Sequence, residues 1–179
     1  MDLESLKYPI GRFKSPKECT SVQIEAWIKV IEIFPRALSM EVENLNDAQL
    51  DTPYRPDGWT LRQLVHHCAD SHMNSFTRLK LTLTEDNPTI KPYKEDLWAE
   101  LPDSNLPIAS SLKILEGLHY RWCILLHSLT ESDLEKTFYH PETQRQTTLK
   151  TYIALYAWHC AHHLAHITQL KQNQNWVYQ

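Results

Sequence analysis

Apolar residues recur every three or four positions along four long stretches of the chain, which is the spacing of an amphipathic helix. The first stretch runs through VQIEAWIKVIEIFPRALSMEVENL to about Leu45. Pro35 lies inside it and predicts a kink or an interruption, because proline lacks the backbone N–H. The motif SPKE at 15–18 offers a capping serine, a proline at the first helical position and a following glutamate. We therefore expect this helix to begin directly after Ser15.

Three further stretches predict helices of similar length. Thr60 can cap TLRQLVHHCADSHMNSFTRLKLTL, which covers 60–83, and SSLKILEGLHYRWCILLHSL covers 110–129. Thr148 begins the last helix, which includes WHCAHHLAHITQL. Four helices of this length can share one core when they pack side by side.

The connections between these helices predict only short elements. Residues 46–59 are rich in Asp, Pro and Gly and indicate a connector. Four prolines between 85 and 107 exclude a long helix there, although KEDLWAE can form a short one, and this segment is a candidate lid or rim. Residues 130–148 are turn-like and partly extended in character. We expect a single all-α domain over 1–179, a four-helix bundle with short extra elements in the connections.

Composition and charge narrow the range of functions. The formal net charge is −4, so the positive field of a nucleic-acid-binding protein is missing. No apolar stretch approaches membrane-spanning length, and MDLESLKYPIGRFK carries acidic residues where a signal peptide would be basic. The four cysteines are scattered and lack CxxC spacing, which argues against a disulfide scaffold. These features predict a cytoplasmic protein with a small-molecule substrate and with neither a nucleic-acid nor a membrane partner.

A cluster of histidines near the end of the last helix is the clearest candidate for chemistry. Successive residues of a helix are rotated by about 100° around its axis. On this basis all four histidines fall within one arc of roughly 100° beside the apolar face: His159, His162, His163 and His166. His159 and His163 lie closer to the apolar side than the other two, so this pair is the better candidate for pointing inward. Two histidines four residues apart stand one turn apart and can bind one cation. A lone buried histidine is more often a hydrogen-bonded core residue, whereas the cluster favours a metal site.

A metal site needs a further ligand from another element, and the second predicted helix offers three histidines. Its apolar stripe centres near His72, leaves His67 at the border and places His66 nearly opposite. Periodicity therefore leaves both His67 and His72 open as the third ligand.

The motifs YPIGRFK, LDTPYRPDGWTLRQLVHHCADSHMNSFTRLKLTLTE, FYHP and WHCAHHLAHITQL resemble, in order and spacing, the DinB-like superfamily and within it the YfiT-type metal-dependent hydrolases. The resemblance covers nearly the whole chain. It implies a four-helix bundle that forms a homodimer and holds one divalent metal per subunit, zinc before nickel. Carried over by position, the implied ligands are His67, His159 and His163, and one coordination position stays open.

Three kinds of function fit such a site. Three neutral imidazoles plus water form the catalytic type of zinc site, in which an activated water attacks a small ester or amide. The same open position can instead activate a low-molecular-weight thiol, as in the bacillithiol-type S-transferases that this fold resembles. The third candidate is a metal-binding stress module without turnover.

No residue is assigned a catalytic role from the sequence. Asp70, His72, His162 and His166 lie near the implied ligands, yet each can equally be an ordinary packed or solvated side chain. Cys68 and Cys160 directly follow two implied ligands. Adjacent helical residues point about 100° apart, so we do not expect the thiols to bind the same ion.

Overall fold

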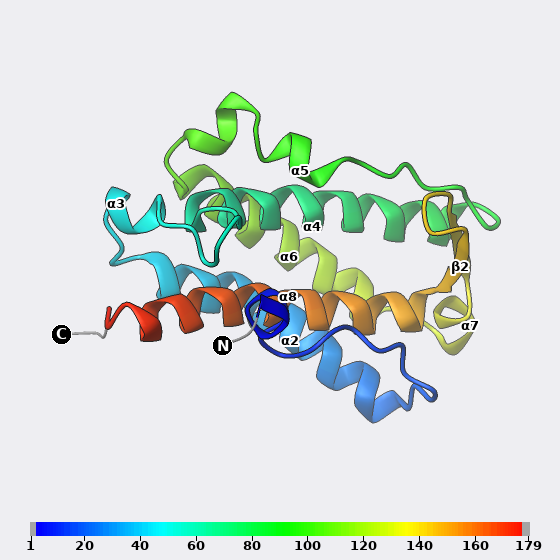
Figure 1. The fold of residues 1–179 in the computed structure, drawn as a ribbon. Coiled ribbons are helices and arrows are strands. Elements are labelled where there is room, and N and C mark those ends of the chain that lie inside the picture. Colours follow the sequence, from blue (N-terminus) through cyan, green and yellow to red (C-terminus); the bar gives the residue numbers. More distant parts are fainter. Residues whose placement is uncertain (1–2, 177–179) are drawn as a thin grey trace.

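Four long helices form the body of the molecule in a computed structural model that describes residues 3–176 (Figure 1). They are α2 (Ser21–Val42), α4 (Leu61–Thr84), α6 (Ala109–His127) and α8 (Leu149–Asn173). Helices α2 and α4 each pack against both α6 and α8, so the order around the bundle is α2, α6, α4, α8. The predicted all-α four-helix bundle is confirmed.

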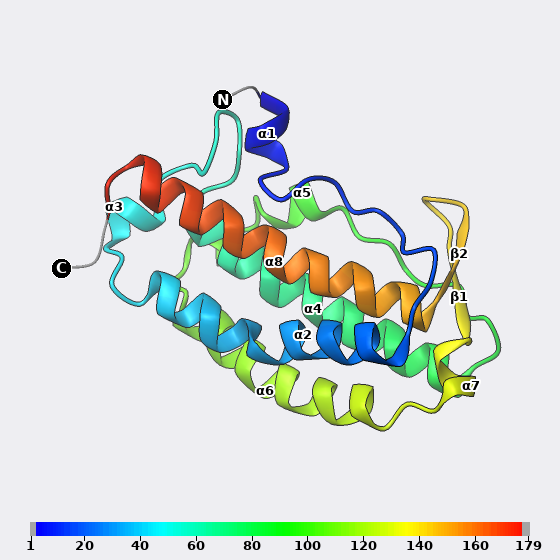
Figure 2. The same ribbon diagram turned by 90° about the horizontal axis from the view of Figure 1, so that it is seen from below.

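The long connection between α4 and α6 sets the direction of the third long helix. Figure 2 shows α4 and α6 running in one direction and α2 and α8 in the other. Residues 85–108 therefore return along the whole length of the bundle before α6 begins. This crossover contains α5 (Glu95–Trp98), which confirms the short helix expected within KEDLWAE, and the 3₁₀ turn η1 (Pro102–Asn105).

The remaining elements of residues 3–176 are short. They are α1 (Leu3–Lys7), α3 (Asp47–Leu50), α7 (Glu131–Leu134) and the antiparallel strands β1 (Thr137–His140) and β2 (Arg145–Thr148). The two strands confirm the partly extended character predicted before α8. Within the described part of the chain, no helix combines the length and the apolar character that crossing a bilayer requires.

The core forms where the inner faces of the long helices meet. Helix α2 buries an apolar residue every three or four positions, as its sequence predicts: Ile24, Ile28, Ile31, Phe34, Leu38 and Val42. Trp122 of α6 and Leu64 of α4 are also buried in this core. Each such side chain contributes about 1.5–3 kcal/mol when it leaves water, so the core holds the four helices in fixed register.

Helix α2 begins later than the SPKE motif predicts, and that expectation was wrong. The N-cap is Thr20, whose hydroxyl accepts a hydrogen bond from the Gln23 N–H at 3.3 Å, while the Gln23 side chain accepts from the Thr20 N–H at 3.0 Å. The preceding segment crosses α8, where Trp158 donates to the carbonyl of Gly11 at 3.1 Å. A helix beginning after Ser15 would shorten this segment, since a helical residue advances about 1.5 Å and an extended one about 3.3 Å.

Pro35 does not interrupt α2, so of the two outcomes expected from its position, a kink or an interruption, the interruption does not occur. The N–H that proline lacks would have bonded to the carbonyl of Ile31, four residues earlier. That carbonyl instead accepts a hydrogen bond from Nδ1 of His119 on α6 at 2.7 Å. A side chain from a neighbouring helix thus satisfies the group that Pro35 leaves free.

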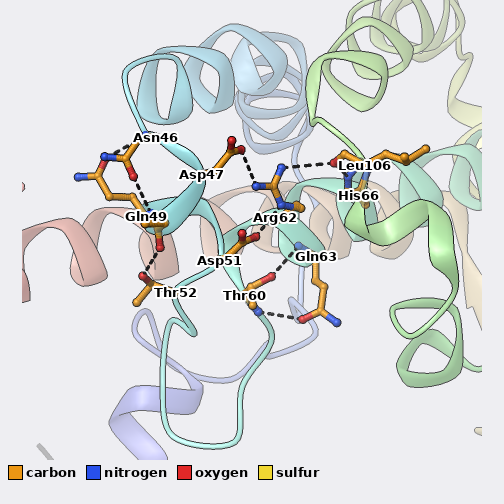
Figure 3. Close-up of polar contacts among 11 residues, drawn as sticks. Asn46, Asp47, Gln49, Asp51, Thr52, Thr60, Arg62, Gln63, His66 and Leu106 are labelled. Carbon is orange, nitrogen blue, oxygen red and sulfur yellow. Dashed lines mark hydrogen bonds and ion pairs between the residues drawn. The ribbon is translucent and has the colours of Figure 1, made fainter.

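The first turn of α4 is fixed by a cap and by a buried arginine (Figure 3). Thr60 is the N-cap, as predicted, and forms a capping box with Gln63. The buried guanidinium of Arg62 donates to Asp51 at 2.6 Å and to Asp47 at 2.8 Å, which ties α4 to α3. These contacts fix the rotation of α4 about its axis, and with it the direction in which the histidines of this helix point.

Candidate metal centre

Three histidines from two antiparallel helices converge inside the bundle. His67 lies on α4, and His159 and His163 lie one turn apart on α8. Each offers one ring nitrogen such that the three nitrogens all lie within 4.8 Å of one another. The Nε2 atoms of His159 and His163 are 3.2 Å apart. Among residues 3–176, no other group of three or more His, Cys, Asp or Glu side chains meets this spacing.

Burial keeps these three rings neutral. The pKa of His67 falls to about 4, chiefly because burial disfavours the charged ring and secondarily because His162 is near. Burial also lowers the pKa of His159 and of His163 well below the ordinary range. A neutral imidazole keeps one nitrogen lone pair, which is the form that binds a metal. The cluster is therefore prepared to donate three lone pairs at neutral pH.

His72, the alternative that periodicity left open, lies at the centre of the bundle and is wholly buried. Its two ring nitrogens each contact another histidine, and only one of these histidines, His159, belongs to the group of three. Its Nδ1 lies 2.7 Å from Nε2 of His119, and its Nε2 lies 3.1 Å from Nδ1 of His159. His67, the position that the resemblance implied, thus joins the group, while His72 lies outside it and contacts Nδ1 of His159.

His119 was missed at the level of sequence. It has no other histidine within seven residues on either side, and no local pattern sets it apart from an ordinary core residue. Its importance depends on Pro35, which lies 84 positions earlier and frees the carbonyl that His119 binds. Only the packing of α2 against α6 brings the two together.

The other two histidines of α8 form a second pair beside the first. The Nε2 atoms of His162 and His166 are 3.2 Å apart, the same distance as in the first pair. His162 stacks on Trp158 with ring centroids 4.5 Å apart, and His166 lies against Tyr54 at 4.2 Å. Burial lowers the pKa of both rings, to about 4 for His162. Both face aromatic rings, and within the described residues neither joins the group of three.

Ser71 places a hydroxyl beside the cluster. Its Oγ lies 3.4 Å from Nε2 of His159 and 3.3 Å from the hydroxyl of Tyr156. No pattern in the sequence indicates Ser71, since its place beside the cluster depends on the packing of α4 against α8. Asp70, which the sequence did single out, is half-buried, and burial followed by the charge of Asp103 raises the pKa of its carboxyl.

The two cysteines next to the predicted ligands point into the core. Cys68 and Cys160 have no exposed surface. Burial raises the pKa of each thiol, most strongly for Cys160, so both stay protonated at neutral pH. Within the described residues neither thiol joins the group of three histidines, and all four cysteines of the chain are free.

Three neutral histidines from two antiparallel helices thus meet at one point inside a four-helix bundle. This arrangement defines a class of helical proteins with a candidate divalent-metal site. The sequence model of the DinB superfamily matches residues 31–167, and the chain belongs to this family.

Relatives and a solved structure agree with this assignment. A Bacillus cereus (strain 03BB102) protein named "Putative metal-dependent hydrolase" is 57% identical over 174 residues, which are 97% of this chain and 100% of that protein. A Bacillus anthracis (strain A0248) protein of the same name is 56% identical with the same coverage. The structure described as "YfiT from Bacillus subtilis is a probable metal-dependent hydrolase with an unusual four-helix bundle topology" superimposes with a TM-score of 0.94 at 48% identity. That match covers 97% of this chain and 99% of the other, which confirms the resemblance inferred from the sequence.

Proposed function

We propose that the protein is a metal-dependent hydrolase in which His67, His159 and His163 hold one divalent cation, zinc before nickel, and act on a small ester or amide. The observation that carries this proposal is the convergence of three neutral imidazole nitrogens within 4.8 Å. The names of the relatives point to the same class.

The donor set fits a catalytic rather than a structural ion. A structural zinc site is closed by four protein ligands, whereas catalytic sites keep three and leave one position for water or substrate. The described residues supply three histidines and no carboxylate or thiolate to this group. Because neutral imidazoles do not offset the charge of the ion, a bound cation keeps its full positive field. When bound, a zinc-type cation supplies Lewis acidity and brings the pKa of water to about 7.

The surrounding side chains of the chain itself shape the site. The indole of Trp59 lies against the ring of His67 with centroids 4.6 Å apart and shields it from solvent. The hydroxyls of Ser71 and Tyr156 lie on the α4–α8 side of the cluster and can donate to or accept from a polar group of the substrate. The site therefore combines an apolar wall with a small polar edge.

Turnover with and without a thiol tests the reaction type. Protein purified without a metal-affinity tag, loaded with zinc or nickel, is assayed on a panel of small esters and amides. We expect hydrolysis with water alone, abolished in His163→Ala. His166→Ala is the matched control and is expected to retain hydrolysis, because His166 lies on the same helix and is paired in the same way with a histidine four residues earlier. A product that carries the added thiol would assign the S-transferase alternative instead. Metal binding without turnover, whether or not a thiol is added, would favour the non-catalytic metal-binding module.

We also propose that the protein forms a homodimer through the groove between α2 and α6. This groove measures about 1060 Å³, and Tyr120 and Ile124 line it while remaining 74% and 55% exposed. Both helices contribute both signs of charge to its lining, which suits an interface between identical surfaces: Glu32, Arg36, Lys113 and Glu116. Light scattering after gel filtration is expected to give twice the monomer mass of 21.1 kDa, and Ile124→Glu to give the monomer.

A further inference from the structure

The chain of contacts behind His159 begins at a backbone carbonyl. Pro35 removes the N–H that would have bonded to Ile31 O, and Nδ1 of His119 lies 2.7 Å from that oxygen. A carbonyl oxygen accepts and never donates, so His119 carries its proton on Nδ1. The ring is buried, which lowers its pKa to about 4, so it is neutral at neutral pH. Its Nε2 is therefore an acceptor.

The same logic passes through His72. Its Nδ1 lies 2.7 Å from Nε2 of His119, so Nδ1 of His72 is the donor and its Nε2 is left with the lone pair. That Nε2 lies 3.1 Å from Nδ1 of His159, so His159 donates from Nδ1. His72 is wholly buried and packs against aromatic rings and histidines, among them Phe34 and Trp122. A neutral ring with one proton is the form that such surroundings favour.

We propose that His119 and His72 are positioning residues that fix His159 in the Nδ1–H tautomer, so that its Nε2 lone pair faces the metal position. The inference rests on the proposed three-histidine site and adds two residues that contact neither metal nor substrate. Free histidine in water favours the opposite tautomer, with the proton on Nε2. The network therefore reverses the intrinsic preference of His159 before any ion arrives.

The geometry at His159 agrees with this assignment. Its Nε2 lies 3.4 Å from the hydroxyl of Ser71, which can donate to a lone pair, and 3.2 Å from Nε2 of His163, the second α8 histidine of the group. By contrast, Nδ1 of His163 is buried and has no hydrogen-bond partner in the described part of the chain. Of the two α8 ligands, His159 is the one held by a buried network, and that network ends at a single backbone carbonyl of α2.

The tautomer can be read directly in metal-free protein. Long-range ¹H–¹⁵N correlation spectra of ¹⁵N-histidine-labelled protein assign the protonated nitrogen of each ring. We expect His159 to carry its proton on Nδ1 in the native chain and to lose this preference in His119→Phe, which keeps an aromatic ring but has no acceptor for His72. His119→Gln, which offers an amide oxygen to His72, is expected to restore it. His66→Phe is the matched control, since buried His66 also donates to a backbone carbonyl, that of Leu106 at 2.9 Å, outside this network.

Metal affinity provides a second readout. Competition with a chromophoric chelator is expected to show about ten- to hundred-fold weaker zinc binding in His119→Phe, and unchanged binding in His66→Phe. A native His159 protonated on Nε2, or an Nδ1–H tautomer that persists in His119→Phe, would overturn the proposal. The spectra are recorded without metal and without substrate, so failure to observe hydrolysis would refute the proposed function and leave this test intact.

Discussion

The buried histidines make the metal-free protein sensitive to acid, and His119 allows the effect to be calculated. Its ordinary pKa of 6.5 falls to about 4 in the fold because burial disfavours the charged ring. Below pH 6.5 the unfolded chain binds a proton that the folded chain does not, so the free energy of unfolding falls as the pH drops from 6.5 to 4 and then levels off. At pH 5 the loss is about 2 kcal/mol for this one residue.

His67 adds a similar amount, since its pKa also falls to about 4 and it is likewise buried. Together the two histidines remove about 4 kcal/mol at pH 5, a large part of the 5–15 kcal/mol that stabilises a typical domain. Urea unfolding of chelator-treated protein at pH 7 and at pH 5 measures this difference. We expect the metal-free protein to remain folded above about pH 5 and to unfold below it.

Two variants separate the histidine effect from general destabilisation. His119→Phe is expected to reduce the difference between pH 7 and pH 5 by about 2 kcal/mol, although it also leaves the Ile31 carbonyl without its donor. Phe34→Leu, a change in an apolar neighbour of His119, is expected to lower stability equally at both pH values. Equal unfolding free energies for the native chain at pH 7 and pH 5, or an unchanged difference in His119→Phe, would show that the fold does not hold His119 neutral.

Three further predictions concern the Arg62 cluster, the metal site and the buried cysteines. Arg62→Ala removes the buried guanidinium bonds to Asp47 and Asp51 and is expected to cost about 2 kcal/mol in urea unfolding, and a cost below about 0.5 kcal/mol would contradict the role given to this cluster. Zinc or nickel at about 100 times its dissociation constant is expected to raise the unfolding free energy by about 2.7 kcal/mol, a gain that a chelator reverses; a melting temperature that ignores both would argue against binding to the folded state. Cys68 and Cys160 are expected to react with an aromatic disulfide reagent only after unfolding, because both are fully buried and their thiol pKa values are raised; rapid labelling of either residue in the native protein, located by mass spectrometry, would show that the core opens.

The helices of the bundle were predictable because their information is local. The spacing of Ile24, Ile28 and Ile31 in α2 follows from helical periodicity, and Thr60 caps α4 through Gln63, only three residues away. The start of α2 was predicted wrongly because two successive capping patterns, SPKE at 15–18 and TSVQ at 20–23, lie in one short stretch, and the contact of Trp158 with the segment before α2 favours the later one. No local rule contains that contact.

The site was predictable in part for the same reason. His159 and His163 stand one turn apart on one helix, so a helical wheel identifies them as a pair. The choice between His67 and His72 depends on the rotation of α4 relative to α8, which the sequence of α4 alone does not contain. His72 does occupy the centre of the apolar stripe, as periodicity indicated, but its nitrogens bind His119 and His159.

Metal content decides whether the three histidines form a metal site, and elemental mass spectrometry on protein purified without a metal-affinity tag determines it. We expect about one divalent ion per chain, lost in His67→Ala, His159→Ala and His163→Ala and kept in His166→Ala, with unchanged helical circular dichroism throughout. Native protein that holds no metal and takes up neither zinc nor nickel would contradict the proposed site. Full metal content in His67→Ala would show that α4 does not supply the third ligand at this position.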